Sequence, residues 1–341
     1  MKISVFAFPI LVLATMSSAH AKDLQWREIA HHDLGGNGGW DLMAVDAAAR
    51  RVYVTRGDHL MVVDADRGTL VGDITGLQKA HGVAIVPKRH RGYVTSGGED
   101  LVVAFDLDSL KVITKIPVEH NPDAIVFDAK SERVLAFNAG SKSVSVIDPA
   151  SDQRVATIAL PGKPELAVSN EKGGVFVNLE DVAKVARLDV GAARVASVWA
   201  LPDCEDPSGI AIDTKHDRVF SVCQNKQMVV TDARTGAHVA TVPIGSGPDG
   251  AAFDPVNGAA FSSNSDGTLT IVRENDPNHF TVAQTLSTPV RSRCITLDAK
   301  THRAILATGK FGAAPNGSVT DPHPRPPMVP DSFGLLFVGR S

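Results

Sequence analysis

The chain has 341 residues, a formal net charge of −4 at pH 7 and an aromatic content of only 5%. Its lysine and arginine residues are scattered, so it lacks the broad basic face that duplex nucleic acid requires. It also has too few aromatic residues for a platform that stacks single strands. Nucleic acid is therefore not an expected partner.

Residues 1–21 are typical of a secretory signal peptide. Lys2 precedes an apolar run over residues 3–16, and a small-x-small sequence ending at Ala21 follows. The run is short for a bilayer span, and no later segment could be one, although a membrane anchor is the alternative interpretation. Cleavage after Ala21 removes one lysine and no acidic residue, so the charge of −4 becomes −5. We expect the mature protein, residues 22–341, to be one domain that is periplasmic or secreted.

Residues 23–34 form a predicted β-strand that has no partner strand nearby in the sequence. A loose tail is the alternative interpretation, but Trp26 and Ile29 give this segment apolar side chains to bury. At the other end of the chain, the last repeat stops after its third strand, Leu335–Val338. We expect the two fragments to complete one blade, because their pairing would protect both sheet edges.

A pattern of four short strands recurs seven times between these ends. In the clearest copy, residues 122–160, four apolar or alternating segments are joined by polar turns, which is typical of an antiparallel meander. The period of about 40 residues and the two-residue alternation predict an all-β fold, a seven-bladed β-propeller of four-stranded antiparallel blades, rather than helical repeats. The residues that end the first strands are 41 to 44 positions apart: Asp46, Pro87, Asp128, Asn170, Asp213, Asp254 and Asp298.

Polar residues precede the first strands, where the channel of a propeller opens. Closure of the ring would place Arg293 between Asp249 and Asp41, so we expect it to neutralise both. His81, Asp123 and Glu165 could hold a divalent cation, or the two carboxyls could raise each other's pKa and supply a general acid. A polar lining of a wet channel is the alternative interpretation. The candidate ligand-binding residues are Asp41, His81, Asp123, Glu165, Asp249 and Arg293.

Histidines also gather before the first strands. His31, His32, His81 and His120 share this position, and His323 joins them if the last insertion folds over the same face. Clustered imidazoles could bind a transition metal, although their spacing matches no regular metal motif. Solvated loop histidines are the simpler interpretation. A divalent metal cation is the only cofactor that the sequence suggests.

Two of the three cysteines belong to the same repeat. Cys204 lies in the loop before the fifth first strand, and Cys223 ends the second strand of that repeat, which places both at one face. Because an exported protein meets an oxidising compartment, we predict a disulfide between Cys204 and Cys223. Cys294, inside a first strand, is expected to be a buried thiol.

Residues 309–333 interrupt the last repeat between its second and third strands, where the other repeats have a short turn. Their proline content excludes a helix or a central strand. A loop of this length is expected to be either a lid over part of the channel mouth or a disordered segment without a task.

The repeat resembles the YVTN-type repeat of seven-bladed, YncE-like periplasmic propellers. Tyr53-Val54-Thr55 and Tyr93-Val94-Thr95 match its core, and Asn138 and Asn264 match its terminal asparagine. The Pro-Asp pairs at 122 and 248 and the Pro-Ser-Gly sequence at 207 match its usual start. The resemblance spans essentially the whole mature chain and implies the fold. It implies little about activity, because propellers host scaffolds, lyases, lactonases and electron-transfer subunits. The asparagine is replaced at Arg56, Ser96, Leu179 and Cys223.

Two classes of function remain open. A regular repeat with one elaborated loop favours a non-catalytic, monomeric scaffold that binds a small molecule or a periplasmic protein through the channel-mouth face. The alternative is a lactonase-like hydrolase or lyase that uses the mouth carboxylates and histidine with a divalent cation. The sequence contains no zinc-protease, haem-attachment, serine-hydrolase or phosphate-loop motif that would point to another chemistry.

Overall fold

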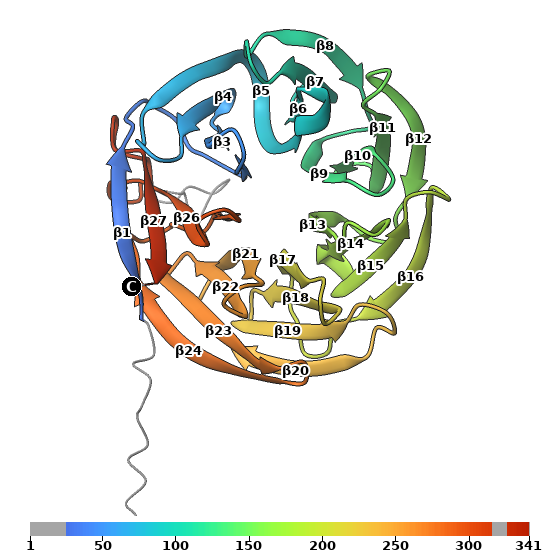
Figure 1. Ribbon diagram of the computed structural model, residues 1–341, viewed down its shortest axis with the longest axis vertical. Helices are drawn as coiled ribbons and strands as arrows, with labels where there is room; N and C mark the ends of the chain where they lie inside the picture. The colour runs from blue at the N-terminus through green and yellow to red at the C-terminus, as the bar shows by residue number, and fades with distance from the viewer. Residues whose placement is uncertain (1–24, 316–325, 341) are drawn as a thin grey trace, which may run out of the picture.

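The computed structural model describes residues 25–315 and 326–340 and arranges them as a ring of blades around a central axis (Figure 1). Five blades are separate four-stranded antiparallel sheets. The other two form a seven-stranded sheet, because β5 (Leu70–Val86) continues from the outermost strand of the first blade into the innermost strand of the second. The all-β propeller fold is confirmed. The predicted signal peptide lies outside the described residues, and no helix within those residues could cross a bilayer.

Each blade begins with a strand beside the central axis, and a second strand pairs with it. Besides the second half of β5, the first strands are β2 (Met43–Asp46), β9 (Pro122–Asp128), β13 (Pro164–Ser169), β17 (Pro207–Asp213), β21 (Pro248–Asp254) and β25 (Ile295–Asp298). The second strands are β3 (Arg51–Thr55), β6 (Arg91–Ser96), β10 (Arg133–Asn138), β14 (Gly174–Leu179), β18 (Arg218–Cys223), β22 (Ala259–Asn264) and β26 (Arg303–Thr308).

The third and fourth strands lie progressively farther from the axis (Figure 1). The third strands are β4 (Gly57–Asp64), β7 (Leu101–Asp106), β11 (Ser143–Asp148), β15 (Lys184–Asp189), β19 (Gln227–Asp232), β23 (Thr268–Asp276) and β27 (Gly334–Arg340). Besides the first half of β5, the fourth strands are β8 (Val112–Pro117), β12 (Gln153–Ala159), β16 (Arg194–Ala200), β20 (His238–Pro243), β24 (His279–Ser287) and β1 (Trp26–Asp33). The short 3₁₀ turns η1 (Pro87–Arg89) and η2 (Glu180–Val182) interrupt two connections.

The chain ends close the ring, as the sequence predicts. β1 pairs antiparallel with β27, from Trp26 opposite Arg340 to Asp33 opposite Gly334. Trp26 is buried, and its indole meets the ring of Phe261 in the sixth blade edge to face, with the ring centroids 4.8 Å apart. The first strand of the chain therefore completes the seventh blade and also ties it to the sixth.

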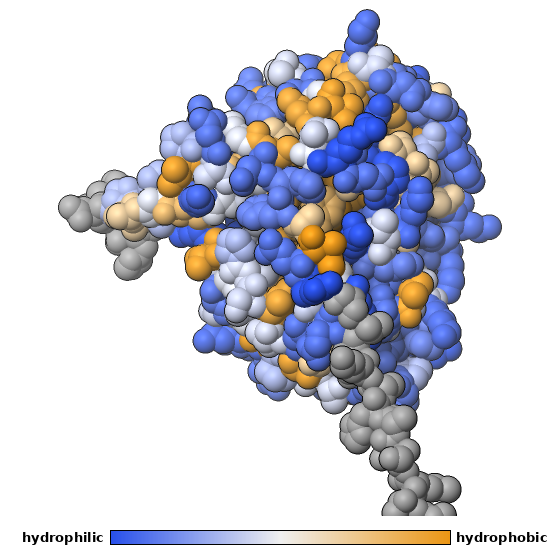
Figure 2. Space-filling model, turned by 60° about the vertical axis from the view of Figure 1, so that its left-hand side comes forward, coloured by the Kyte–Doolittle hydropathy of each residue, from blue (hydrophilic) through white to orange (hydrophobic). Residues whose placement is uncertain are grey.

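The core lies between the blades. Second and third strands such as β10 and β11 are buried along almost their whole length, because neighbouring sheets cover both of their faces. Fourth strands such as β12 expose most of their side chains to solvent. One core group joins Phe137 of the third blade to Val175 and Val177 of the fourth. On the side of the ring shown in Figure 2, polar residues predominate and hydrophobic residues form separate patches.

An aspartate ends the first strand of five blades and holds the turn that follows. Asp46 accepts hydrogen bonds from the N–H groups of Ala48 and Ala49 at 3.1 and 2.9 Å. Asp298 also accepts a hydrogen bond of 2.8 Å from Arg50 of the next blade. The recurring aspartate in the sequence thus marks both a turn and a contact between blades.

Candidate functional site

The starts of the first strands converge at one end of the central axis and enclose a cavity of about 280 Å³. We call this cavity the channel mouth. Its lining includes all six residues that the sequence analysis selected, which are Asp41, His81, Asp123, Glu165, Asp249 and Arg293. The register of the repeat explains this convergence, because residues five or six positions before the end of each first strand occupy similar places around the axis. Ligand binding by this cavity stays a prediction.

Threonines of the second strands fasten the loops that carry the mouth residues. The hydroxyl of Thr55 donates to the carbonyl of His81 at 2.8 Å. Thr95, one blade further on, donates to the carbonyl of Asp123 at 2.8 Å. These are the threonines of the two Tyr-Val-Thr sequences, so the recurring motif positions the backbone of the next blade's mouth residue.

Asp41, His81 and Asp123 form the tightest group in the channel mouth. His81 Nδ1 lies 2.7 Å from Asp41 Oδ2 and 3.8 Å from Asp123 Oδ1. One ligand atom from each of the three residues lies within 4.8 Å of the others, a spacing that could hold a metal ion. Imidazole and carboxylate ligands together suit divalent transition metals such as Zn²⁺ and Mn²⁺.

Two carboxyl groups of the mouth are poorly solvated, which raises their pKa. Burial raises the pKa of Glu165 to about 8, and the neighbouring Asp123 carboxylate adds to the effect. Burial also raises the pKa of Asp123 to about 6, against the opposing influence of His81. The hydrogen bond to Asp41 raises the pKa of His81 above its usual value. The cavity thus contains more carboxylate than it can easily keep ionised.

The structure groups these residues differently from the sequence analysis. The predicted cation site was Asp123, Glu165 and His81, but Asp41 takes the place of Glu165 in the tight group. Glu165 lines the same cavity outside that group. Arg293 forms an ion pair with Asp249, with Nη1 and Oδ1 3.3 Å apart. Asp41 contacts His81 directly at 2.7 Å, and its charge also attracts Arg293, as the sequence predicted.

Two charged residues of the mouth were missed from the sequence. Lys163 lies two positions before Glu165, and its ammonium group forms an ion pair with Glu180. The attraction of Glu180, Glu165 and Asp123 raises the pKa of Lys163. The candidate residues came from the positions five and six before the end of each first strand, and these two residues lie at other positions in the repeat. The lysine partly offsets the negative charge on this side of the mouth.

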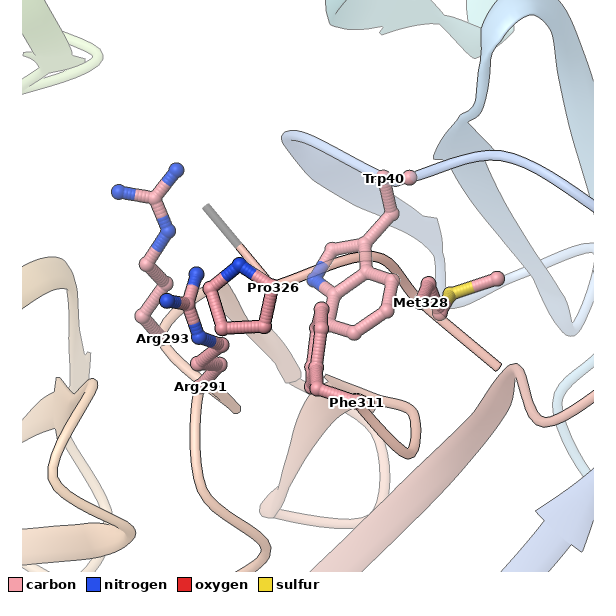
Figure 3. A pocket seen from close by; sticks show the side chains of 7 residues that line it. Trp40, Arg291, Arg293, Phe311, Pro326 and Met328 are labelled. Carbon is pink, nitrogen blue, oxygen red and sulfur yellow. The ribbon is translucent and has the colours of Figure 1, made fainter. Parts of the chain in front are cut away.

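A second hollow of about 210 Å³ adjoins the mouth and shares Arg293 with it. Trp40 and Phe311 line this hollow, with ring centroids 5.7 Å apart, and the guanidinium of Arg291 lies 5.2 Å from the Phe311 centroid (Figure 3). Phe311 and Met328, from the two described arms of the insertion, pair as an isolated β-bridge. We call this second hollow the aromatic hollow. The described arms of the predicted lid thus lie beside the mouth.

The other histidines do not join His81. His31 and His32 belong to β1, the outermost strand of its blade. His31 Nε2 lies 3.0 Å from Thr308 Oγ1, and the ring of His32 packs edge to face on Phe337. His120 is exposed and lies beside Asp100. The predicted cluster of imidazoles is therefore absent among the described residues, which do not include His323.

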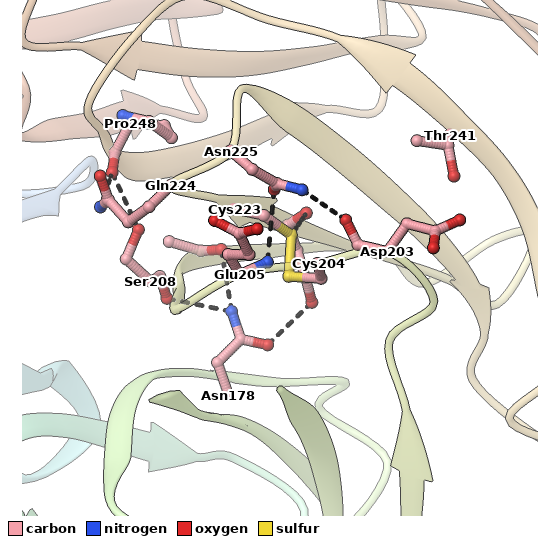
Figure 4. Close-up of a disulfide and its surroundings, with 12 residues drawn as sticks. Asn178, Asp203, Cys204, Glu205, Ser208, Cys223, Gln224, Asn225, Thr241 and Pro248 are labelled. Carbon is pink, nitrogen blue, oxygen red and sulfur yellow. Dashed lines mark hydrogen bonds between the residues drawn. A yellow bond between two sulfur atoms is a disulfide. The ribbon is translucent and has the colours of Figure 1, made fainter. Parts of the chain in front are cut away.

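The structure contains a disulfide between Cys204 and Cys223, whose Cα atoms are 5.4 Å apart (Figure 4). It fixes the loop before β17 to the end of β18. Gln224, next to Cys223, donates to the carbonyl of Pro248 at 2.8 Å and lines the mouth. The disulfide thus supports the wall of the channel mouth. Cys294 is buried, as expected.

No known family model matches the chain, and no curated protein is similar to it in sequence. Among solved structures, the chain is similar to a chain of hydrazine synthase from Kuenenia stuttgartiensis, with a TM-score of 0.70 and 14% sequence identity. The similarity covers 82% of this chain and 94% of that chain. At this level of identity the likeness shows the β-propeller fold and nothing about activity.

Proposed function

We propose that this protein is an exported, monomeric propeller of the YVTN type that binds a small organic anion together with a divalent cation at its channel mouth. It acts as a binding scaffold and not as a catalyst. The observation that carries the proposal is the Asp41, His81 and Asp123 group, which lies at the axis inside a cavity with excess carboxylate.

A cation would relieve the electrostatic cost of this arrangement. Asp123 and Glu165 have a raised pKa because their negative charge is desolvated and concentrated. A divalent ion offers these carboxylates a closer counter-charge than Lys163 or Arg293 provides. Its binding should therefore release protons and strengthen as the pH rises from 5 to 8.

The aromatic hollow indicates the organic part of the ligand. Within the described ranges, no carboxylate lies at ion-pair distance from the Arg291 guanidinium. Trp40 and Phe311 present apolar ring surfaces next to it. A ligand with a carboxylate on a flat or apolar group would pair with Arg291 and pack against the two rings. Arg293 lines both the hollow and the channel mouth, so it connects the hollow to the cation site.

A lactonase-like hydrolase is the second candidate, and the raised pKa of Glu165 favours it. A carboxyl group that is half protonated near pH 8 and lies close to a cation site could transfer a proton during hydrolysis. Incubation of Mn²⁺-loaded protein with γ-butyrolactone separates the two candidates. Turnover that Glu165→Gln abolishes would establish the hydrolase, and no turnover is expected from the scaffold.

Calorimetric titration of chelator-treated protein with Mn²⁺ at pH 7.5 tests the cation site. His81→Ala and Asp123→Asn should weaken the mouth site at least tenfold. His120→Ala removes a histidine that lies beside a carboxylate outside the mouth, so it is the matched control and should bind as the wild type does. Equal binding by all four proteins would refute the proposed site. Benzoate serves as the probe for the aromatic hollow, and Arg291→Ala should remove its stabilising effect in thermal melts.

A further inference from the structure

A buried carboxylate lies far from the channel mouth, where the fifth and sixth blades meet. Glu274 belongs to β23, and its side chain is only 4% exposed. It faces Asp213, which ends β17, and His216 in the turn that follows β17. Since the mouth residues precede the first strands and Asp213 ends one, this group lies at the opposite face of the ring.

Comparison of the blades shows that Glu274 occupies a position that is apolar elsewhere. Its N–H donates to the carbonyl of Gly258 at 2.9 Å, in the turn before the second strand. The N–H groups of Ala65, Leu107 and Ala233 make the equivalent bond in their own blades at 2.9, 3.1 and 2.9 Å. Those three residues are between 3% and 5% exposed. Packing therefore requires a small or apolar side chain here, and the carboxylate calls for another explanation.

Three atoms that could coordinate a metal ion lie close together at this position. His216 Nδ1 lies 2.6 Å from Asp213 Oδ2 and 2.8 Å from Glu274 Oε1. Asp213 is 2% exposed. Within the part of the chain that the structure describes, neither His216 Nδ1 nor Glu274 Oε1 has a partner with hydrogen-bond geometry. One imidazole nitrogen carries at most one proton, so it cannot satisfy two carboxylates at once.

A divalent ion would balance the charge of this group and also give a common partner to His216 Nδ1 and Glu274 Oε1, which lack a hydrogen-bond partner among the described residues. Two ionised carboxylates beside a protonated His216 would leave one uncompensated negative charge in a buried place, whereas a divalent ion with neutral imidazole would balance both. The other charged residues around the adjoining hollow are Lys215 and Asp276, which are both exposed. Their opposite charges leave the imbalance unchanged.

We infer that Asp213, His216 and Glu274 form a second metal site, which binds a divalent transition metal such as Zn²⁺ and clamps the fifth blade to the sixth. Imidazole nitrogen and carboxylate oxygen are ordinary zinc ligands, with bonds of about 2.0–2.2 Å. Small side-chain rotations would open the observed spacing to fit the ion. His216 borders a hollow of about 440 Å³, which gives the ion a path from solvent and leaves a coordination position for water.

The repeat itself supplies the test variant. Glu274→Ala installs the residue that two other blades carry at this position, so the variant should fold, and His216→Ala removes the nitrogen ligand. Calorimetric titration with Zn²⁺ should show one equivalent fewer, or at least a tenfold weaker site, in both variants. Co²⁺ added to the wild type should give visible absorption, and the part that comes from this site should be missing in both variants.

The mouth variant His81→Ala separates this inference from the proposed function. It should keep the Zn²⁺ equivalent and the Co²⁺ band that depend on Glu274, even if the mouth binds no metal. Zn²⁺ should raise the melting temperature of His81→Ala but not that of the double variant His81→Ala with Glu274→Ala, because metal bound only to the folded state stabilises it. Unchanged Zn²⁺ stoichiometry and affinity in Glu274→Ala and His216→Ala would overturn the second site.

Discussion

Replacing Trp26 with alanine should loosen the closure of the ring without touching the channel mouth. Trp26 is 6% exposed and packs with Phe261, Leu306 and Val338 in one core group that joins the last two blades. Its backbone N–H and carbonyl are both held by the side chain of Gln284, at 3.0 and 2.8 Å. These backbone bonds survive the substitution, so the loss comes from the indole alone.

The size of the loss follows from burial and ring geometry. Removing a buried tryptophan side chain costs roughly 3–5 kcal/mol of unfolding free energy, including the cavity that it leaves. The edge-to-face pair with Phe261 accounts for about 0.5–1.5 kcal/mol of this cost. At roughly 2 °C per kcal/mol for a large domain, the melting temperature should fall by about 6–10 °C.

Thermal melts and denaturant titrations of the mature protein would measure this effect. Glu28→Ala is the matched control, because Glu28 lies in the same strand and is exposed. The control should melt within about 1 °C of the wild type, since exposed substitutions usually change stability by no more than about 0.5 kcal/mol. If Trp26→Ala melts at the same temperature as Glu28→Ala, the indole of the closing strand does not stabilise the ring as predicted.

Three further predictions concern pH, redox state and processing. The folded protein retains a proton on Glu165 that the unfolded chain releases above a pH of roughly 4.5, so wild-type stability should fall as the pH rises from 5 to 8. Glu165→Gln should flatten this dependence in melts across that range. An unchanged slope would count against the raised pKa. The Cys204–Cys223 disulfide closes a loop with a sequence separation of 19, so its reduction should lower the free energy of unfolding by roughly 3 kcal/mol on the chain-entropy model. Mass mapping that finds both thiols free in exported protein would reject the bond. N-terminal sequencing of the exported protein should begin directly after Ala21, and an intact leader would contradict the predicted signal peptide.

The fold could be predicted from the sequence because each blade repeats the same local rules. Strand ends marked by Asp128, Asp213 and Asp254 fall where the periodic pattern places them. The continuous strand β5 was not predicted, because nothing in a single repeat shows that the outer strand of one blade runs directly into the inner strand of the next. The path of the connection depends on how two blades sit together.

The sequence could predict which residues line the channel mouth, but not which of their side chains contact one another. Their positions, five or six residues before the end of a first strand, correctly indicate that Asp41, His81 and Asp123 share one cavity. Which carboxylate approaches the imidazole depends on side-chain direction, so Asp41 and not Glu165 completes the tight group. Glu274 left a signal in the sequence, since a charged residue there replaces the apolar residue of other repeats. Its partner His216 comes from another blade, and only the assembled ring brings the two together.

Anomalous diffraction from a crystal of the mature protein grown with Mn²⁺ would show whether the channel mouth binds a divalent cation. We predict a peak at the channel mouth, about 2–2.5 Å from Asp41, His81 and Asp123, because these are the bond lengths of a divalent cation with oxygen and nitrogen ligands. A mouth without an anomalous peak at saturating Mn²⁺ near pH 8, where Asp123 is ionised, would contradict it.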